Sequence, residues 1–170
     1  MTRVGLLSDT HSYFDPQLKD VFAECDVIWH AGDVGNVAVW DQLTALQKPL
    51  TGVYGNIDGK DIRIISPLEQ TWRVEEMKIY MIHIGGYPGH YPSRIRQRLE
   101  EIKPDIFVCG HSHILKVMYD HTLQLLHLNP GACGYEGFHK VRTALRFSID
   151  GNKVTDMQVL ELGSRSLVRK

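Results

Sequence analysis

The N-terminal part of the chain alternates between short apolar runs and amphipathic segments, and this order constrains the fold more than any other feature. Apolar runs at 4–8, 27–29 and 50–54 are typical of buried strands, and residues 17–24 and 37–46 have the spacing of amphipathic helices. A β-α-β-α-β order predicts parallel strands joined by right-handed crossovers. The loops that follow these strands should therefore gather at one edge of a sheet.

After Gly59 strands dominate the pattern. Residues 72–76 and 78–84 are typical of a strand pair, and a charged helix at 92–102 precedes a buried strand at 106–109. Turn signals then separate four further expected strands, at 117–119, 123–128, 143–149 and 154–160. We expect a second, largely antiparallel sheet that packs on the first.

Length and composition bound the number of domains. The chain has 170 residues, 43% of them hydrophobic, which is enough for one core and too little for a second independent one. We therefore predict a single domain over residues 1–163 and a frayed C-terminal tail over 164–170.

Charge and cysteine usage exclude several function classes. Lys and Arg number 19 against 20 for Asp and Glu, so no global field attracts the chain to nucleic acid or to a membrane surface, and we expect neither as a partner. The cysteines, Cys25, Cys109 and Cys133, are odd in number and share no CxxC spacing, which favours reduced thiols. No apolar run suits a signal peptide or a membrane span, so we expect a cytoplasmic protein.

Polar side chains that can carry chemistry recur where the expected strands end. Each fragment alone is also a common turn sequence, and the run SDTHS equally suits a loop that caps a helix. Seven such residues nevertheless fall at strand ends: Asp9, His11, Asp33, Asn56, His83, His111 and His113. Together they point to one site.

These residue types fit a pair of metal ions. Two divalent ions about 3.5–4 Å apart need a carboxylate that can bridge them, with nitrogen and oxygen ligands on either side. Two aspartates supply two negative charges, whereas Asn56 and the four histidines are neutral, so two dications would retain a positive surplus that attracts a phosphate ester. Ligation without thiolate favours Mn, Fe, Zn, Co or Ni, of which we expect manganese.

The ordered blocks DTH, GD, GN, a strand-end His and GHSH resemble those of the calcineurin-like metallophosphoesterase superfamily, and the NPGA block is similar to its small prokaryotic phosphodiesterase branch. The resemblance implies an α/β sandwich of two packed mixed β-sheets flanked by helices, with a dinuclear metal site at one edge. It also implies the ligand sets. Asp9, His11 and His113 would hold one metal, Asn56, His83 and His111 would hold the other, and Asp33 would bridge them.

The reaction expected from this resemblance is metal-dependent hydrolysis of a small phosphoester, in the first place a phosphodiester. A hydroxide that bridges the metals would attack phosphorus in line. We expect Asp33, Asn56 and His83 to be the catalytic residues, and a backbone amide near residues 129–131 to bind phosphate oxygens.

Two departures from the family pattern concern proton transfer. Many members carry a histidine directly after the asparagine, where it protonates the leaving group, but Ile57 occupies that position here. His83 is followed by IGGYPGH instead of the usual His-Gly pair. His90 in that loop either approaches the site or, in the reading we prefer, lies on the surface.

Other residues rank lower. His30 and Asp58 either orient ligands through hydrogen bonds or simply pack, and His139 matches no ligand block. Arg94 and its two neighbouring arginines fall on the charged helix, where a mixed face is usually solvated. They would contact phosphate only if that helix borders the site.

Two other function classes compete with an enzyme. The first is a protein-binding scaffold, as in the retromer subunit that resembles this fold and has lost catalytic ligands, and the presence of all seven residues here counts against it. The second is a structural metal site, which would be closed by four ligands and would not need Asp33 as a bridge. Exposed strand edges in the C-terminal half also favour a homodimer.

Overall fold

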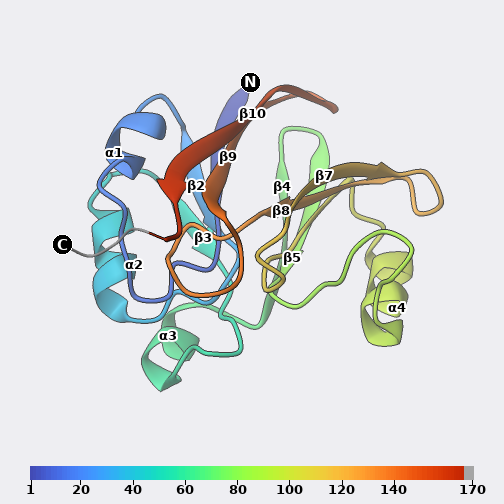
Figure 1. Ribbon diagram of the computed structural model, residues 1–170. Coiled ribbons are helices and arrows are strands. Elements are labelled where there is room, and N and C mark those ends of the chain that lie inside the picture. Colours follow the sequence, from blue (N-terminus) through green and yellow to red (C-terminus); the bar gives the residue numbers. More distant parts are fainter. Residues whose placement is uncertain (167–170) are drawn as a thin grey trace.

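Two five-stranded β-sheets form a sandwich in the computed structural model, which describes residues 1–166 (Figure 1). The first sheet has the order β10-β9-β1-β2-β3 and the second β4-β5-β6-β8-β7. The strands of the first sheet are β1 (Thr2–Leu7), β2 (Val27–His30), β3 (Leu50–Gly52), β9 (Val141–Asp150) and β10 (Lys153–Ser164). Those of the second are β4 (Glu69–Val74), β5 (Met77–Ile82), β6 (Ile106–Val108), β7 (Leu115–Asp120) and β8 (Leu125–Pro130). Both sheets contain parallel and antiparallel pairs, which confirms the expected sandwich of mixed sheets.

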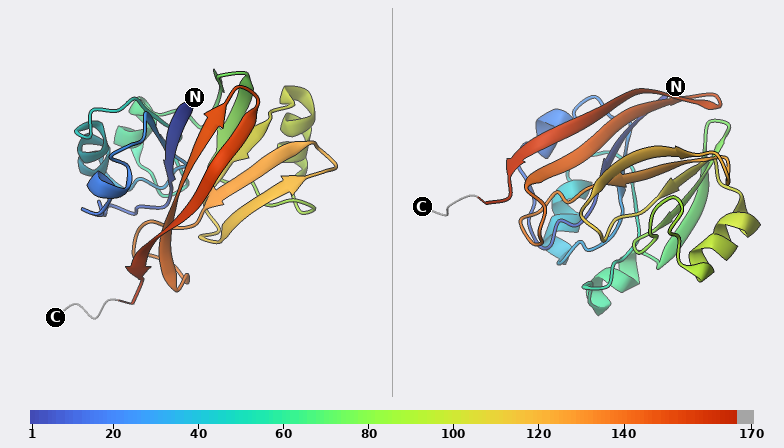
Figure 2. Two further views of the ribbon diagram at one scale, coloured as in Figure 1. Left: turned by 90° about the horizontal axis from the view of Figure 1, so that it is seen from above. Right: turned by 45° about the vertical axis from the view of Figure 1, so that its right-hand side comes forward.

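The described residues form four helices, which are α1 (Leu18–Val21), α2 (Val37–Thr44), α3 (Lys60–Ile65) and α4 (Ser93–Ile102). Of these, α3 lies at one end of the sandwich and the other three lie on its outer faces (Figure 1). The two views in Figure 2 show α1 and α2 against the first sheet and α4 against the second. Apolar side chains explain this arrangement, since Leu18 and Leu43 pack with Ile28 of β2, whereas Leu99 of α4 packs with Phe107 of β6.

The main core lies between the sheets and fixes where the strands end. Side chains alternate along β1, so that Val4 and Leu6 join this core while Leu7 packs under the helices. Met81 of β5 and Val108 of β6 meet them from the second sheet. All five are fully buried, which contributes about 1.5–3 kcal/mol for each side chain. The loops after β1, β2, β5 and β6 therefore start from rigid positions.

Several sequence predictions about the elements were wrong. The strands expected at 143–149 and 154–160 belong to the first sheet rather than the second, because β9 pairs with β1. The second sheet is not largely antiparallel, since β5, β6 and β8 run parallel. The helix expected at 17–24 is only the short α1, where no side chain caps the first turn and Ala23 makes a tighter turn to Asp20. The sequence reasoning missed α3, which buries only Ile62.

The C-terminal boundary differs slightly from the prediction. Strand β10 includes Ser164, and the Arg165 amide donates a hydrogen bond to Lys140, so two residues of the expected tail belong to ordered structure. Residues 167–170 of that tail lie outside the described residues. Within residues 1–166, no helix has the length and apolar character needed to cross a membrane.

Candidate metal centre

The folded chain brings all seven predicted ligands to one end of the sandwich. Asp9 and His11 follow β1, Asp33 follows β2, and Asn56 follows β3. From the second sheet, His83 follows β5, and the pair His111 and His113 follows β6. These strands are parallel to their partners within each sheet, so their carboxyl ends lie side by side. Residues more than 100 positions apart thereby share one site, as in the hydrogen bond from the His111 amide to Asp9.

Six of the ligands form two groups, each with potential ligand atoms within 4.8 Å of one another. The first group is Asp9, His11 and His113, and the second is Asp33, His83 and His111. Asn56 joins the second group because its Oδ1 lies 2.9 Å from Nδ1 of His111. Two ligand atoms about 2.1 Å from one ion and at right angles are about 3 Å apart. This division matches the two ligand sets that the sequence resemblance implied.

Asp33 lies between the two groups. Its Oδ2 is 3.3 Å from Nε2 of His11 in the first group and 3.2 Å from Nε2 of His83 in the second. Its other oxygen, Oδ1, accepts a hydrogen bond of 3.1 Å from the backbone N–H of Ile57. The side chain is therefore held on one side and presents one oxygen to both groups.

The backbone at the ligands is unusual. Five of the seven have positive φ angles, between 45° at His11 and 68° at His111, with Asp9, Asp33 and His113 between these values. This left-handed conformation costs an ordinary residue about 1–2 kcal/mol. It turns the chain sharply at the end of each strand, which places the side chain over the strand ends. The surrounding packing maintains this strain, as is common at functional sites.

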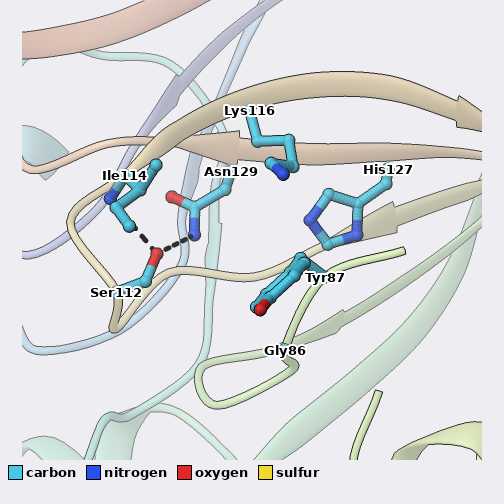
Figure 3. Close-up of a pocket in the computed structure, with 7 residues that line it drawn as sticks. All are labelled: Gly86, Tyr87, Ser112, Ile114, Lys116, His127 and Asn129. Carbon is cyan, nitrogen blue, oxygen red and sulfur yellow. Dashed lines mark hydrogen bonds between the residues drawn. The ribbon is translucent and has the colours of Figure 1, made fainter. Parts of the chain in front are cut away.

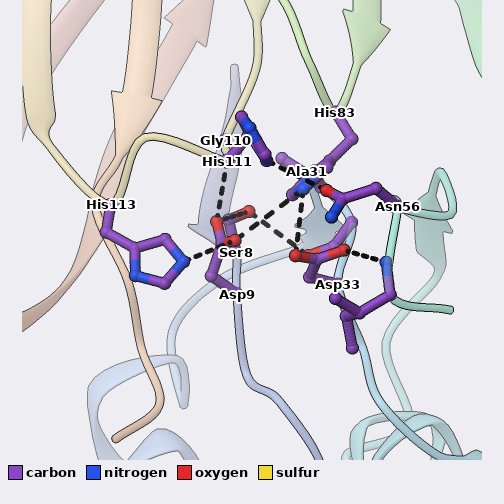
Figure 4. A network of polar contacts seen from close by, with 12 residues as sticks. Ser8, Asp9, Ala31, Asp33, Asn56, His83, Gly110, His111 and His113 are labelled. Atoms are coloured by element: carbon purple, nitrogen blue, oxygen red, sulfur yellow. Dashed lines mark hydrogen bonds and ion pairs between the residues drawn. The ribbon is translucent and has the colours of Figure 1, made fainter. Parts of the chain in front are cut away.

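Figure 4 shows the contacts of Asp9 and His83 within the site. Oδ2 of Asp9 accepts hydrogen bonds from the Ser8 hydroxyl and from the His111 amide, whereas Oδ1 accepts no hydrogen bond from residues 1–166. Nδ1 of His83 lies 2.7 Å from the carbonyl oxygen of Ala31. A carbonyl can only accept, so Nδ1 carries the proton and the lone pair of Nε2 faces the site.

Unpartnered atoms converge at the centre of the site. Oδ1 of Asp9, Nε2 of His11 and Nε2 of His83 are buried and have no hydrogen-bond partner among the described residues. Oδ1 of Asp9 is 3.8 Å from each of these two nitrogens and 3.1 Å from Nε2 of His113. Buried polar atoms are almost always satisfied, and cations would satisfy this set of carboxylate oxygens and imidazole nitrogens. The residues present therefore fit divalent metal ions.

The site is electrostatically polarised even without metal. Burial alone would raise the pKa of Asp9 and Asp33, but contacts with the histidines, His11 above all, hold both well below the usual range. The nearby carboxylates of Asp33, above all, and of Asp9 raise the pKa of His11 to about 9. At His83, burial lowers the pKa, but the charges of Asp33 and Asp9 outweigh burial and the pKa is raised. Both carboxylates are thus ionised at neutral pH and favour cations.

Asp58 and His30 support the loops rather than the ligand side chains. The Asp58 carboxylate accepts hydrogen bonds from the backbone N–H groups of Val34, Gly35 and Gly55, which ties the loop after β2 to the loop after β3. The Gly32 N–H donates to Nδ1 of His30, so Nε2 carries the proton toward the Thr10 hydroxyl. Burial lowers the pKa of His30 to about 4 and keeps it neutral.

One sequence prediction about phosphate binding was wrong. The backbone N–H of Gly131 donates to Oδ1 of Asn129, so this amide is already used. The Asn129 side chain also donates to the Gly110 carbonyl and the Ser112 hydroxyl. The segment at 129–131 therefore braces the loop that carries His111 and His113.

The sequence reasoning missed the position of His139. Its ring lies 5.2 Å from that of His113, its Nε2 is 2.9 Å from the Gly134 carbonyl, and its Nδ1 is buried without a partner among the described residues. The segment between β8 and β9 carries it there, and no ligand block marked it. His90, in contrast, is exposed and packs against Tyr87, as expected.

Two pockets lie near the loops that carry the ligands, and of these two only the second is lined by ligand residues. The first, called the lysine pocket, has a volume of about 310 Å³ and contains Ser112, the residue between His111 and His113 (Figure 3). Its other lining residues are Gly86, Tyr87, Ile114, Lys116, His127 and Asn129. The second, called the arginine pocket, has a volume of about 420 Å³, and its lining includes Asn56, His83, Arg63 and Arg94.

Comparison with known proteins identifies the family. The model described as the calcineurin-like phosphoesterase superfamily domain matches residues 2–152. A probable metallophosphoesterase from Methanothermobacter thermautotrophicus is 27% identical over 168 residues, which cover 95% of this chain and 93% of the relative.

Two solved structures share the fold. One is described as a novel archaeal phosphodiesterase, with a TM-score of 0.70, 19% identity, and coverage of 93% of this chain and 99% of that one. The other is wild-type Vps29 from Entamoeba histolytica complexed with Zn²⁺, with a TM-score of 0.73, 17% identity, and coverage of 95% and 99%. At these identities the likeness shows the fold alone, whereas the family model shows the family. The chain belongs to the calcineurin-like phosphoesterase superfamily.

Proposed function

We propose that this protein is a phosphodiesterase that holds two divalent metal ions between the seven ligands and hydrolyses small phosphodiesters. The observation that carries the proposal is the convergence of Oδ1 of Asp9, Nε2 of His11 and Nε2 of His83, which are buried and unpartnered among the described residues. A site with this donor set and no cation would leave several buried atoms unsatisfied. Family membership supports metal-dependent phosphoester hydrolysis.

The chain's own residues position the ions and the substrate. When bound, two divalent ions supply an activated water nucleophile and neutralise charge on the phosphoryl oxygens. Asp33 contributes the oxygen that faces both ligand groups, and the Ile57 N–H keeps that carboxylate in place. Asn56 and His83 lie at the border between the second ligand group and the arginine pocket. The ion that they would hold is therefore placed beside the space that the organic substituent of a phosphoryl group would enter.

The arginine pocket gives space for an organic group of the substrate. Asn56 and His83 are among its lining residues, so a substituent on the phosphoryl group has room there. The preference for a diester rests on the resemblance to the small phosphodiesterase branch. The solved archaeal phosphodiesterase shares this fold, in agreement with the proposal.

Manganese is the metal that we propose first. Four imidazoles, two carboxylates and one amide oxygen suit Mn, Fe, Zn, Co and Ni better than magnesium, which prefers oxygen. To rank these metals, the metal-free protein is loaded with each ion separately, and its metal content and turnover are measured.

A scaffold that binds metal without turnover is the competing function. Vps29 shares the fold and was solved with Zn²⁺, so metal binding alone does not distinguish an enzyme from such a protein. Turnover by the reconstituted protein separates the two functions. A structural metal site is disfavoured because it would hold a single ion closed by four ligands, whereas Asp33 here faces both ligand groups.

The test is hydrolysis of bis-p-nitrophenyl phosphate and p-nitrophenyl phosphate by protein reconstituted with manganese. We expect the diester to be hydrolysed faster, and the Asp33→Asn variant to lose most activity together with at least one metal. Asp41→Asn is the matched control, because Asp41 is an exposed carboxylate on α2 outside the site. If wild-type protein binds two ions and hydrolyses neither ester, the scaffold function holds instead.

The proposed division of ligands has its own test. His111 and His113 are two positions apart but belong to different groups, so alanine at each should weaken a different ion. Anomalous scattering from manganese-loaded crystals would show which ion each variant loses. Loss of the same ion in both variants would contradict the division.

A further inference from the structure

We propose that the arginine pocket binds an organic group of the substrate that carries a second anion, with Arg63 and Arg94 as the residues that bind this anion. The substrate would then be a phosphoester whose apolar or aromatic part bears a further phosphate or carboxylate. This inference rests on the proposed function, because it places the reacting phosphoryl group at the metal centre.

The pocket is continuous with the metal centre. Asn56 and His83, both proposed ligands of one ion, line its inner end. A phosphoryl group bound between the ions would therefore project a substituent into this space. The volume of about 420 Å³ lies within the range of pockets that enclose small organic ligands.

The walls of the pocket are largely apolar. Tyr54 supplies an aromatic ring, and Leu68, Ile82, Ile84 and Ile95 supply aliphatic side chains. Ile84 is 44% exposed and Leu68 is 39% exposed, which is unusual for large apolar side chains that have no ligand to cover. These walls suit a planar or apolar organic group.

Arg63 is held in place at one side of the pocket. Its Nε donates a hydrogen bond of 2.7 Å to the Asp58 carbonyl, and its guanidinium lies 4.5 Å from the centre of the Tyr54 ring. Its terminal nitrogens have no carboxylate within 4.0 Å among residues 1–166. A guanidinium fixed by its Nε and by stacking offers two donors to an anion at little entropic cost.

Arg94 comes from the opposite wall, on the first turn of α4. The next arginines on this helix are paired with acids, Arg96 with Glu100 at 3.1 Å and Arg98 with Glu69 at 3.0 Å. Arg94 makes no such pair within the described part of the chain. Glu69 is near enough for its pKa to be lowered partly by Arg94, but its oxygens bond to Arg98 and to the Tyr80 hydroxyl. The charge of Arg94 is thus left for a ligand.

The start of α4 adds to the positive character of this wall. Pro92, Arg94 and Ile95 line the pocket, and no side chain caps the N-terminus of the helix. The first N–H groups of a helix favour a nearby anion. From the sequence we expect the arginines of this helix to contact phosphate only if the helix borders the site. Of the three, Arg94 is the one that lines the pocket.

The lysine pocket is a weaker candidate for the second anion. Its one cationic side chain is Lys116, whose Nζ lies 4.8 Å from the centre of the Tyr87 ring (Figure 3). This ammonium already has an electrostatic partner. We therefore assign the second anion to the arginine pocket.

Binding of stable phosphonates tests the inference without depending on turnover. Phenylphosphonate carries one anionic group, and 4-phosphonobenzoate carries a carboxylate on the same ring. The matching one-anion and two-anion biphenyl compounds provide a longer spacer. Titration calorimetry on the manganese-loaded protein should show that, for at least one spacer, the two-anion compound binds about tenfold more tightly than its one-anion partner.

Variants assign this preference to the pocket. Arg94→Ala should reduce the preference to threefold or less, and Arg94→Glu should reverse it. Arg63→Met, which keeps the bulk over Tyr54, should also reduce it. Arg96→Ala is the matched control on the same helix and should keep the wild-type preference, because Arg96 is exposed and paired with Glu100.

Two results would overturn the inference. The first is that wild-type protein does not prefer the two-anion compound with either spacer. The second is that the preference persists in the Arg94 and Arg63 variants, because the charge of the metal centre alone would then explain it. Hydrolysis of bis-p-nitrophenyl phosphate is measured on the same samples. An absent preference in wild-type protein that still hydrolyses this ester contradicts only this inference, whereas two bound metals without turnover contradict the proposed function.

Discussion

Gly55 should be indispensable for the metal centre, although it contributes no side chain. It is buried directly before Asn56, and its N–H donates to Asp58. A Cβ atom at this position would overlap Oδ1 and the backbone nitrogen of Asp33 and would lie 2.8 Å from Cγ, whereas ordinary contact begins at 3.4 Å. In Gly55→Ala the Asp33 carboxylate and the backbone that carries it must therefore move by about 1 Å or more.

The expected effect follows from that displacement. Overpacking of a rigid site costs about 1–3 kcal/mol of stability. Misplacement of a catalytic group by about 1 Å can reduce the rate 10²-fold. We therefore expect Gly55→Ala to hydrolyse bis-p-nitrophenyl phosphate about 100-fold more slowly and to bind the second ion about 10–100-fold more weakly.

The assay is kcat/KM as a function of manganese concentration, together with metal content after dialysis. Gly59→Ala is the control, since a Cβ there would meet only Oδ1 of Asp61 at 3.2 Å and should cost less than about 1 kcal/mol. Gly55→Ala with near-normal turnover and two retained ions would refute the reasoning, because Asp33 could then move without consequence.

Three further predictions test other parts of the account. Arg142 is buried and pairs with Asp15 at 2.6 Å, so Arg142→Met should lower the free energy of unfolding in urea by about 3–5 kcal/mol. A loss below about 1 kcal/mol would show that Asp15 does not need this partner. The nearby carboxylates of Asp33 and Asp9 raise the pKa of His11 to about 9, so a metal that binds at pH 7 must displace a proton, and its apparent affinity should increase about tenfold per pH unit toward pH 9. Calorimetry in buffers of different ionisation enthalpy measures that proton release, and its absence would contradict the assignment of His11. The side chain of Ile57 is 46% exposed, so Ile57→His should be tolerated and should flatten the dependence of rate on leaving-group pKa across substituted phenyl diesters. If the rate of the wild-type protein already depends little on leaving-group pKa, and this dependence steepens only in His90→Ala, His90 is the proton donor.

That the seven residues converge could be predicted because their signal is local. Each lies within a few residues of the end of an apolar run, and the parallel order of the first strands already implied that Asp9, Asp33 and Asn56 would meet. The left-handed backbone at Asp9 and His111 carries no such signal, since Asp and His adopt it only where surrounding packing requires it.

Features that depend on three-dimensional packing could not be predicted. The pairing of β9 with β1 joins segments about 140 residues apart, and no local pattern specifies it. The short helix α3 buries one side chain and lacks a clear periodicity, yet it places Arg63 at the pocket. On the sequence Arg94 looked like Arg96 and Arg98, and only the position of α4 next to His83 distinguishes it.

The most direct test of the central claim is an anomalous difference map from crystals of the protein grown with Mn²⁺. We predict two peaks per chain about 3.5–4 Å apart, with Oδ2 of Asp33 between them. Asp9, His11 and His113 should surround one peak, and Asn56, His83 and His111 the other. A single peak per chain, or two peaks without Asp33 between them, would contradict the account.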